Sequence, residues 1–244
     1  MILYGRNPVR EALRGRRAAS VEEVWANAGA AREPWLAGVR VHLTSAEEIE
    51  RRCGSSSHQG LCASVGPYPY AEAEELLARP RALLVALDQI QDPQNLGSIC
   101  RTAECAGAHG VVIPERRAVE VTPAVCKASA GAVEHLPLAR VRNLADFLLA
   151  ARGEGCWSYG ASARTSGDGR APVCYDAPDY SEGGVVLVLG SEGKGLRPRV
   201  AKACDELIAL PLHGHMESLG VSAAAAALLY GILQKRSAKL DKAS

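Results

Sequence analysis

The spacing of apolar residues divides the chain into a short first part and a longer second part. In the first part, short apolar runs rich in β-branched residues predict strands, at Val21–Trp25, Val39–Leu43 and Gly60–Val65. A helix-capping residue and a first-turn proline at Asn7-Pro8 predict a helix that ends at Gly15, and a second helix is predicted at Ser45–Arg52. We therefore predict a small α/β domain over residues 1–66.

In the second part, strand and helix patterns alternate along the chain. Residues 81–88 form a nearly continuous apolar run, which is typical of a parallel strand buried on both faces. Such alternation indicates a parallel sheet covered by helices. The predicted strands that follow are Gly110–Pro114, Trp157–Ala161, Gly184–Gly190 and Glu206–Pro211, and the predicted helices are Gly97–Ala106, Pro123–Ala130, Leu144–Ala151 and Ser218–Lys235. We predict an α/β domain over residues 81–236, a linker at 67–80 and a frayed tail at 237–244.

Charge is unevenly distributed along the chain. The formal net charge of +1 argues against a protein that binds nucleic acid over its whole surface. The first 20 residues nevertheless hold five arginines and one acid, Glu11. This segment is a candidate phosphate-contacting stripe, with a solvated helix face as the alternative. Its arginines are Arg6, Arg10, Arg14, Arg16 and Arg17.

Composition also bears on location and on metals. No uncharged apolar stretch reaches the roughly 20 residues that a membrane-spanning helix needs, and the N-terminus lacks the apolar core of a signal peptide. We expect a cytoplasmic protein without a membrane partner. Eight cysteines without a CxxC pair indicate buried or free thiols. His213 and His215 lack a Cys or acid partner at ligand spacing, so we predict no metal.

Three loops that contain glycine follow predicted strands, where ligands of open α/β sheets bind. They cover residues 88–104, 187–196 and 210–222. In the second loop, the glycines at 190, 193 and 195 do not fit the dinucleotide-binding pattern, and Lys194 lacks the Ser or Thr that follows the lysine of a P-loop. The loop therefore predicts a backbone that approaches some other ligand closely, with Glu192 as its polar group.

Three ordered motifs in these loops resemble a known family. They are DPxNxGxxxRxAE from Asp92, LGSEGKGL from Leu189 and LPLxGxxxSLxVS from Leu210. Together they resemble the SpoU, or TrmH, branch of the SPOUT RNA methyltransferases. Near the N-terminus, YGRNPVREAL and HQGLCASV are similar to the substrate-binding domain of the RlmB-type enzymes, which methylate the 2′-hydroxyl of a guanosine in 23S ribosomal RNA.

The resemblance implies a fold, a cofactor and partners. The small domain would be L30e-like, and the catalytic domain would carry a trefoil knot at its C-terminal end. The second and third loops would hold S-adenosylmethionine, largely through backbone groups. The implied partners are 23S ribosomal RNA, contacted by Arg6, Arg10 and Arg14, and a second copy of the chain in a homodimer. The candidate cofactor-binding residues are Leu189, Gly190, Leu210, Leu212, Leu219 and Val221.

The implied reaction needs help, because a neutral ribose hydroxyl is a poor nucleophile. The resemblance gives this role to Arg101, with Asn95 and Glu192 shaping the site and Ser218 supporting it. Arginine is almost always charged. Arg101 therefore either loses a proton transiently, or clamps a phosphate and stabilises the developing alkoxide. Taken alone, Asn95 and Ser218 could each be a helix cap, and Glu192 an exposed loop acid.

One position departs from the family pattern and leaves the function open. Members usually have Asn where this chain has Gly220. An active ribose methyltransferase on ribosomal RNA is favoured by the additional N-terminal domain. The alternatives are a transfer-RNA ribose methyltransferase, a resistance enzyme that methylates an adenosine ribose, and a catalytically weak RNA-binding factor of ribosome assembly.

Overall fold

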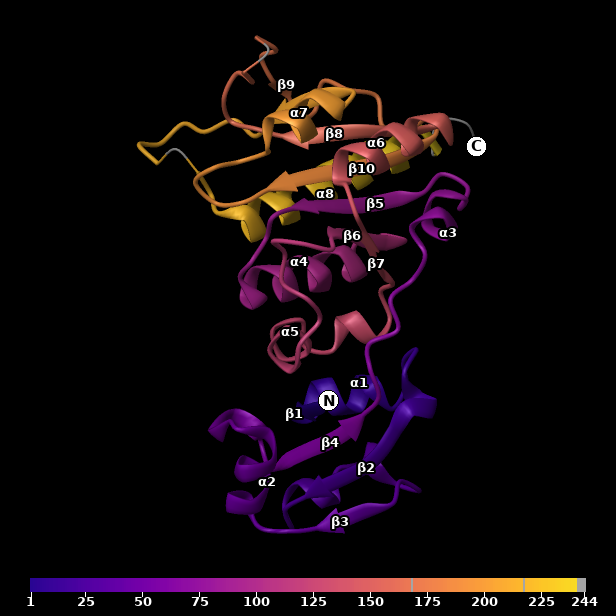
Figure 1. Cartoon of the computed structure of the whole chain (residues 1–244), viewed down its shortest axis with the longest axis vertical. Coiled ribbons are helices and arrows are strands. Elements are labelled where there is room, and N and C mark those ends of the chain that lie inside the picture. Colours follow the sequence, from indigo (N-terminus) through magenta and orange to yellow (C-terminus); the bar gives the residue numbers. More distant parts are fainter. Residues whose placement is uncertain (168, 217, 241–244) are drawn as a thin grey trace.

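The computed structural model describes residues 1–167, 169–216 and 218–240, and it has one sheet at each end of an elongated molecule (Figure 1). The N-terminal sheet is mixed and the larger sheet is entirely parallel. The predicted α/β class, with a small N-terminal domain and a parallel-sheet domain, is confirmed. The trefoil knot stays a prediction.

The N-terminal sheet has four strands in the order β1-β4-β2-β3. They are β1 (Ile2–Tyr4), β2 (Val21–Ala26), β3 (Val41–Leu43) and β4 (Leu61–Val65). Strand β1 was not predicted, because three residues carry too little periodicity. Helix α2 (Ala46–Cys53) begins after Ser45, whose hydroxyl accepts the Glu48 N–H, and ends at Gly54 in the left-handed conformation.

Helix α1 (Arg6–Ala12) corrects two predicted boundaries. It begins directly after Gly5, which has φ 93° and turns the chain out of β1. The predicted cap at Asn7 is therefore wrong, because Asn7 lies inside the first turn. Pro8 follows it there, where its missing N–H costs nothing. The helix also ends three residues before Gly15.

The larger sheet has seven parallel strands in the order β7-β6-β5-β10-β8-β11-β9. The two central strands, β5 and β10, are almost completely buried, as their apolar runs predict. Strands β7 and β9 lie at the two edges and were missed, since they are short. The strands are β5 (Leu83–Asp88), β6 (Gly110–Pro114), β7 (Leu138–Val141), β8 (Cys156–Ala161), β9 (Val173–Cys174), β10 (Gly184–Gly190) and β11 (Glu206–Ala209).

Helices cover both faces of this sheet. One face packs against α4 (Pro93–Cys105) and α8 (Val221–Leu240), and the other against α3 (Ala73–Leu77), α6 (Leu144–Gly153) and α7 (Pro198–Ala203). Helix α5 (Pro123–Ala128) packs against α4 and against β1 of the N-terminal domain. The predicted linker contains helix α3, whose two leucines are buried against the sheet. This part of the segment therefore packs onto the larger domain. Helix α8 continues past its predicted end, so residues 237–240 are helical, while 241–244 lie outside the described residues. None of the helices described here is long and apolar enough to cross a membrane.

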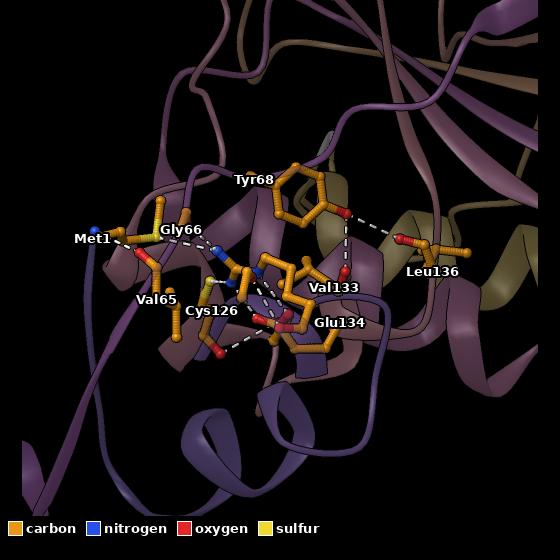
Figure 2. A network of polar contacts seen from close by, with 11 residues as sticks. Met1, Val65, Gly66, Tyr68, Cys126, Val133, Glu134 and Leu136 are labelled. Carbon is orange, nitrogen blue, oxygen red and sulfur yellow. Dashed lines mark hydrogen bonds and ion pairs between the residues drawn. The ribbon is translucent and has the colours of Figure 1, made fainter. Parts of the chain in front are cut away.

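The two domains pack tightly against each other. A single apolar cluster runs from Leu3 and Val9 of the N-terminal domain to Val125 and Val133 of the larger one. At its edge, Arg17 Nε donates to Glu134 Oε2 at 2.8 Å, and Arg17 Nη2 pairs with the other carboxylate oxygen (Figure 2). Arg17 is only 2% exposed. Its predicted place in a phosphate-contacting stripe is therefore wrong, because its charge serves the domain junction.

A tyrosine from the segment between the domains reinforces this junction. The Tyr68 hydroxyl lies 2.9 Å from the Val133 carbonyl and 3.1 Å from that of Leu136, and can donate to either (Figure 2). Burial raises the pKa of this hydroxyl, so it stays protonated as a donor. The junction thus combines apolar packing with hydrogen bonds whose buried polar groups are paired.

Candidate active site

The first and second loops begin side by side at the centre of the sheet. Strands β5 and β10 are neighbours, and Gly190 at the end of β10 pairs with Asp88 at the end of β5. From β5 the chain proceeds to β6 and β7 on one side, whereas β10 and β8 lie on the other side. This is a topological switch point, outside which ligands of open α/β sheets bind. The fold therefore places both loops where a ligand site is expected.

Asp88 joins these two loops and was missed as a site residue. Its carboxylate is fully buried and accepts two hydrogen bonds from Arg197, from the backbone N–H at 2.8 Å and from Nε at 2.7 Å. Arg197 closes the second loop directly before α7. An acid at the carboxyl end of an otherwise apolar strand was the sequence signal that could have identified it.

The second loop folds back tightly over its own beginning. The Gly195 N–H donates to the Ser191 carbonyl at 2.8 Å. A Cβ atom on Gly190 would lie 2.2 Å from the Gly195 carbonyl carbon, so only glycine fits there. The close backbone contact explains why glycine stands at the candidate cofactor-binding position 190. Its neighbour Leu189 is buried in the sheet beneath the loop.

Glu192 brings all three loops together. Its Oε1 accepts from Asn95 Nδ2 at 3.4 Å and from the Val221 N–H at 3.2 Å. Val221 is the first residue of α8, where a carboxylate is favoured by the helix dipole and by the free N–H groups. Three of the predicted site positions thus meet through one carboxylate, and Glu192 is more than an exposed loop acid.

The helix-cap alternatives for Asn95 and Ser218 are wrong. Helix α4 is capped by Asp92, whose side chain accepts the Gln94 N–H at 3.0 Å, and Asn95 lies in the helix with its amide toward Glu192. The Ser218 hydroxyl accepts the Gly220 N–H at 3.1 Å, which forms a turn before α8 begins. Asn95 therefore serves the loop junction, and Ser218 shapes the third loop.

The third loop has the features that a backbone-held ligand needs. In residues 211–216 and 218–219, no backbone group hydrogen-bonds to a backbone group of another described residue. Leu212 and Leu219 are 37% and 53% exposed beside them, and Leu210 is half-buried. Val221, in contrast, is buried at the start of α8. Unpaired N–H and C=O groups next to apolar side chains suit a flat, partly apolar molecule.

Arg101 lies apart from this junction. It follows Asn95 by six residues on α4, which is about 9 Å along the helix axis. Its exposed side chain lines a cavity of about 380 Å³ together with Arg10 and Glu11 of α1. The structure therefore brings a predicted catalytic arginine together with a predicted RNA-contacting one, at the boundary of the two domains.

The other two predicted RNA-contacting arginines lie on the N-terminal domain. Arg6 is exposed and pairs with Glu33 at 2.8 Å, and Arg14 is exposed just after α1. Both are accessible to a large partner, and their role stays a prediction. Across the described residues, no group of three or more His, Cys, Asp and Glu side chains is arranged to hold a metal ion.

Fold and site define a class: a two-domain α/β protein whose loops meet at one carboxylate beside the switch point of a parallel sheet. Residues 82–230 match the model of the SpoU rRNA methylase family, and residues 2–71 match that of the substrate-binding domain of RNA 2′-O ribose methyltransferases. The chain belongs to the SpoU rRNA methylase family.

One relative and two solved structures are similar to the chain. The chain is 41% identical to YacO of Bacillus subtilis, which is named as a TrmH family tRNA/rRNA methyltransferase. The alignment covers 82% of this chain and 79% of YacO. The AdoMet-bound rRNA methyltransferase of Sinorhizobium meliloti has a TM-score of 0.79 at 25% identity, with 96% of this chain and 86% of that chain covered. The SpoU methyltransferase AviRb of Streptomyces viridochromogenes, solved with AdoMet, has a TM-score of 0.80 at 24% identity, with 97% and 90% covered.

Proposed function

We propose that this protein transfers a methyl group from S-adenosylmethionine to a ribose 2′-hydroxyl of RNA, and that its target is a guanosine in 23S ribosomal RNA. The observation that carries the proposal is the junction at Glu192, where three family motifs meet at the switch point of the sheet. Residues 1–66 would then bind the RNA, and residues 81–236 would carry out the transfer.

The second and third loops hold the methyl donor in this proposal. S-adenosylmethionine, when bound, supplies an electrophilic methyl group on a sulfonium. The folded-back turn at Gly190 and the unpaired backbone of the third loop offer hydrogen bonds, while Leu210, Leu212 and Leu219 offer apolar contact. Leu189 and Val221 are buried beneath these loops and keep them in place.

The chain's polar residues act on the RNA ribose. Asn95 and Glu192 fix the geometry of the loops around the reacting hydroxyl, and Ser218 holds the turn that leads into α8. Arg101 shares its cavity with Arg10, and two guanidinium groups at one cavity favour the role of phosphate clamp over that of proton acceptor. A fixed positive charge would also stabilise the alkoxide as it develops.

The choice of ribosomal RNA rests on the N-terminal domain. It presents Arg6, Arg10 and Arg14 to solvent or to the domain boundary, in an arginine-rich segment suited to phosphates. A homodimer is part of the proposal, and α8 offers a surface for it, with Tyr230 52% exposed. Its Ala-rich stretch allows the close approach of another helix.

Gly220 does not disturb the site. It has φ +78°, in the left-handed region that glycine and asparagine both enter, and a Cβ atom there would lie at an ordinary 3.5 Å from Glu192 Oε1. The family's usual Asn would therefore fit, and glycine keeps the same backbone path. The retained loop geometry supports an active enzyme over an assembly factor without turnover.

Transfer of tritiated methyl groups to RNA tests the proposal. Unmodified 23S ribosomal RNA should accept the label, mapping should place it on the 2′-oxygen of one guanosine, and unmodified transfer RNA should stay unlabelled. Labelled transfer RNA alone would favour the transfer-RNA alternative, and label on an adenosine ribose would favour the resistance enzyme. Donor binding measured by calorimetry, without transfer to any RNA, would favour the assembly factor.

Replacing Asp88 with asparagine is expected to weaken donor binding about tenfold. The variant loses a charge-assisted hydrogen bond of about 1.5–3 kcal/mol that fixes the second loop, and about 1.4 kcal/mol corresponds to a factor of ten. Calorimetric titration with S-adenosylmethionine measures the effect. Asp146→Asn removes the same charge from an exposed pair with Arg199 and should leave the Kd unchanged. An unaltered Kd in Asp88→Asn would show that Arg197 does not organise the loop.

A further inference from the structure

A groove follows the boundary between the two domains. Two cavities of about 380 Å³ each lie there, and they share Glu104 and His135. Residues of both domains line them, so neither domain forms the groove alone. We call it the interdomain groove and define it by its basic and histidine side chains, which are Arg10, Arg16, Arg79, Arg101, His109 and His135.

Positive charge is concentrated in this groove. Four arginines face two acids, Glu11 and Glu104, a formal charge of +2 in a chain whose total is +1. Glu11 is already paired, with Arg10 Nε at 2.6 Å and with His135 Nε2 at 2.9 Å. At the Arg79 end of the groove, burial and then the charges of Arg79 and Arg236 lower the pKa of His109, so this histidine does not add to the positive charge at neutral pH. An anion is therefore the ligand that the groove favours.

The groove is preformed because the domain junction fixes both of its walls. Arg16 and His135 line it, and each is the direct neighbour of a member of the buried pair Arg17–Glu134. The Arg16 N–H also donates to the Glu134 carbonyl at 2.8 Å. The polar network around this pair is shown in Figure 2. A ligand would find the walls already ordered, which lowers the entropic cost of binding.

We propose that the interdomain groove binds the sugar-phosphate backbone of the RNA strand that flanks the target nucleotide. This rests on the proposed function and adds the path of the substrate. The two cavities in series suit an extended polyanion, and guanidinium groups recognise phosphates through paired hydrogen bonds. Arg101 lies at the end of the groove nearer to Asn95, so the strand leads from the N-terminal domain along α4 toward the loop junction.

The double variant Arg16→Gln/Arg79→Gln tests the groove. Binding of unmodified 23S ribosomal RNA is measured at a series of KCl concentrations. Each phosphate contact contributes about 0.7–0.9 to the slope of log K against log salt, so the slope should fall by about 1.5 when two contacts are lost. Donor affinity and the melting temperature should stay as in the wild type. Arg199→Gln/Lys202→Gln removes two charges from α7, on the opposite face of the sheet, and should keep the wild-type slope.

The outcomes separate this inference from the proposed function. A wild-type slope in the groove variant overturns the groove, even if the wild-type protein methylates RNA. Equal competition by polyglutamate and by RNA for the groove would also overturn it and would favour an acidic protein partner. In a third outcome, the slope falls in the variant as expected, but the wild-type protein transfers no methyl group to RNA. This result supports the groove, while the proposed function fails.

Discussion

Replacing Glu134 with alanine is expected to destabilise the protein by about 3–5 kcal/mol, because Arg17 would keep a buried charge without its partner. Arg17 and Glu134 are 2% and 0% exposed, so water cannot replace the lost carboxylate. Burial alone lowers the pKa of Arg17, but the hydrogen bond and the charge of Glu134 outweigh it and raise the pKa above its usual value. Burial also raises the pKa of the nearby Cys126 thiol to about 12, so this group stays neutral and cannot balance the charge.

Calorimetry would show this loss as a fall in Tm on the order of 10 °C for a chain of this length. The control is the double variant Arg17→Met/Glu134→Leu, which removes both charges and keeps apolar volume. It should recover most of the stability, since apolar pairs replace buried ion pairs without penalty. Removal of the exposed pair Arg199–Asp146 should change Tm little. A Glu134→Ala protein that melts like the wild type would show that the junction does not depend on this pair.

Loss of this junction should also affect RNA binding. Arg16 and His135 adjoin the pair in sequence and line the interdomain groove. At temperatures where the Glu134→Ala protein is still folded, RNA binding should therefore be weaker than in the wild type. Donor binding should stay intact, because other strands build the switch point. Arg17→Met/Glu134→Leu should restore both stability and RNA binding, which would link them through the junction.

The sequence predicted the elements whose burial is uniform or periodic. Strands β5 and β10 were found because both faces of each are buried and their residues are apolar without interruption. The three loops after β5, β10 and β11 were found because each combines glycine with a preceding strand. The family resemblance then supplied Asn95 and Glu192, and the structure joins them at 3.4 Å.

What the sequence could not show depends on partners distant in the chain. Arg17 stands among exposed arginines and differs from them only because Glu134, 117 residues later, packs against it. Asp88 has the same character, since Arg197 is 109 residues away. The order of the strands, which puts β10 beside β5, is equally a tertiary property. Short edge strands such as β9 carry two residues and no periodic signal.

Replacing Arg101 with alanine is expected to reduce methyl transfer by about 100-fold to 1000-fold, the cost of removing one positioned group that stabilises developing charge. Its side chain is exposed in the cavity shared with Arg10, so the variant should fold with an unchanged Tm. Donor binding should also persist, because Asn95, which contacts the second of the loops that we assign to the donor, lies about 9 Å from Arg101 along the axis of α4. Single-turnover methyl transfer and calorimetric donor titration measure the two properties separately. Near-normal turnover would remove Arg101 from the reaction.

Arg101→Lys distinguishes the two roles that arginine could have. Lysine has an ordinary pKa of about 10.4, well below that of arginine, and it cannot form the two parallel hydrogen bonds of a guanidinium. If Arg101 accepts the proton, the lysine variant should gain rate as the pH rises toward 10, because more of its amine becomes neutral. If Arg101 clamps a phosphate, the variant should stay slow and lose rate as the pH approaches 10, because the charge that holds the phosphate disappears. Two guanidinium groups facing one cavity predict the second profile, since together they can hold one phosphate through several charge-assisted hydrogen bonds.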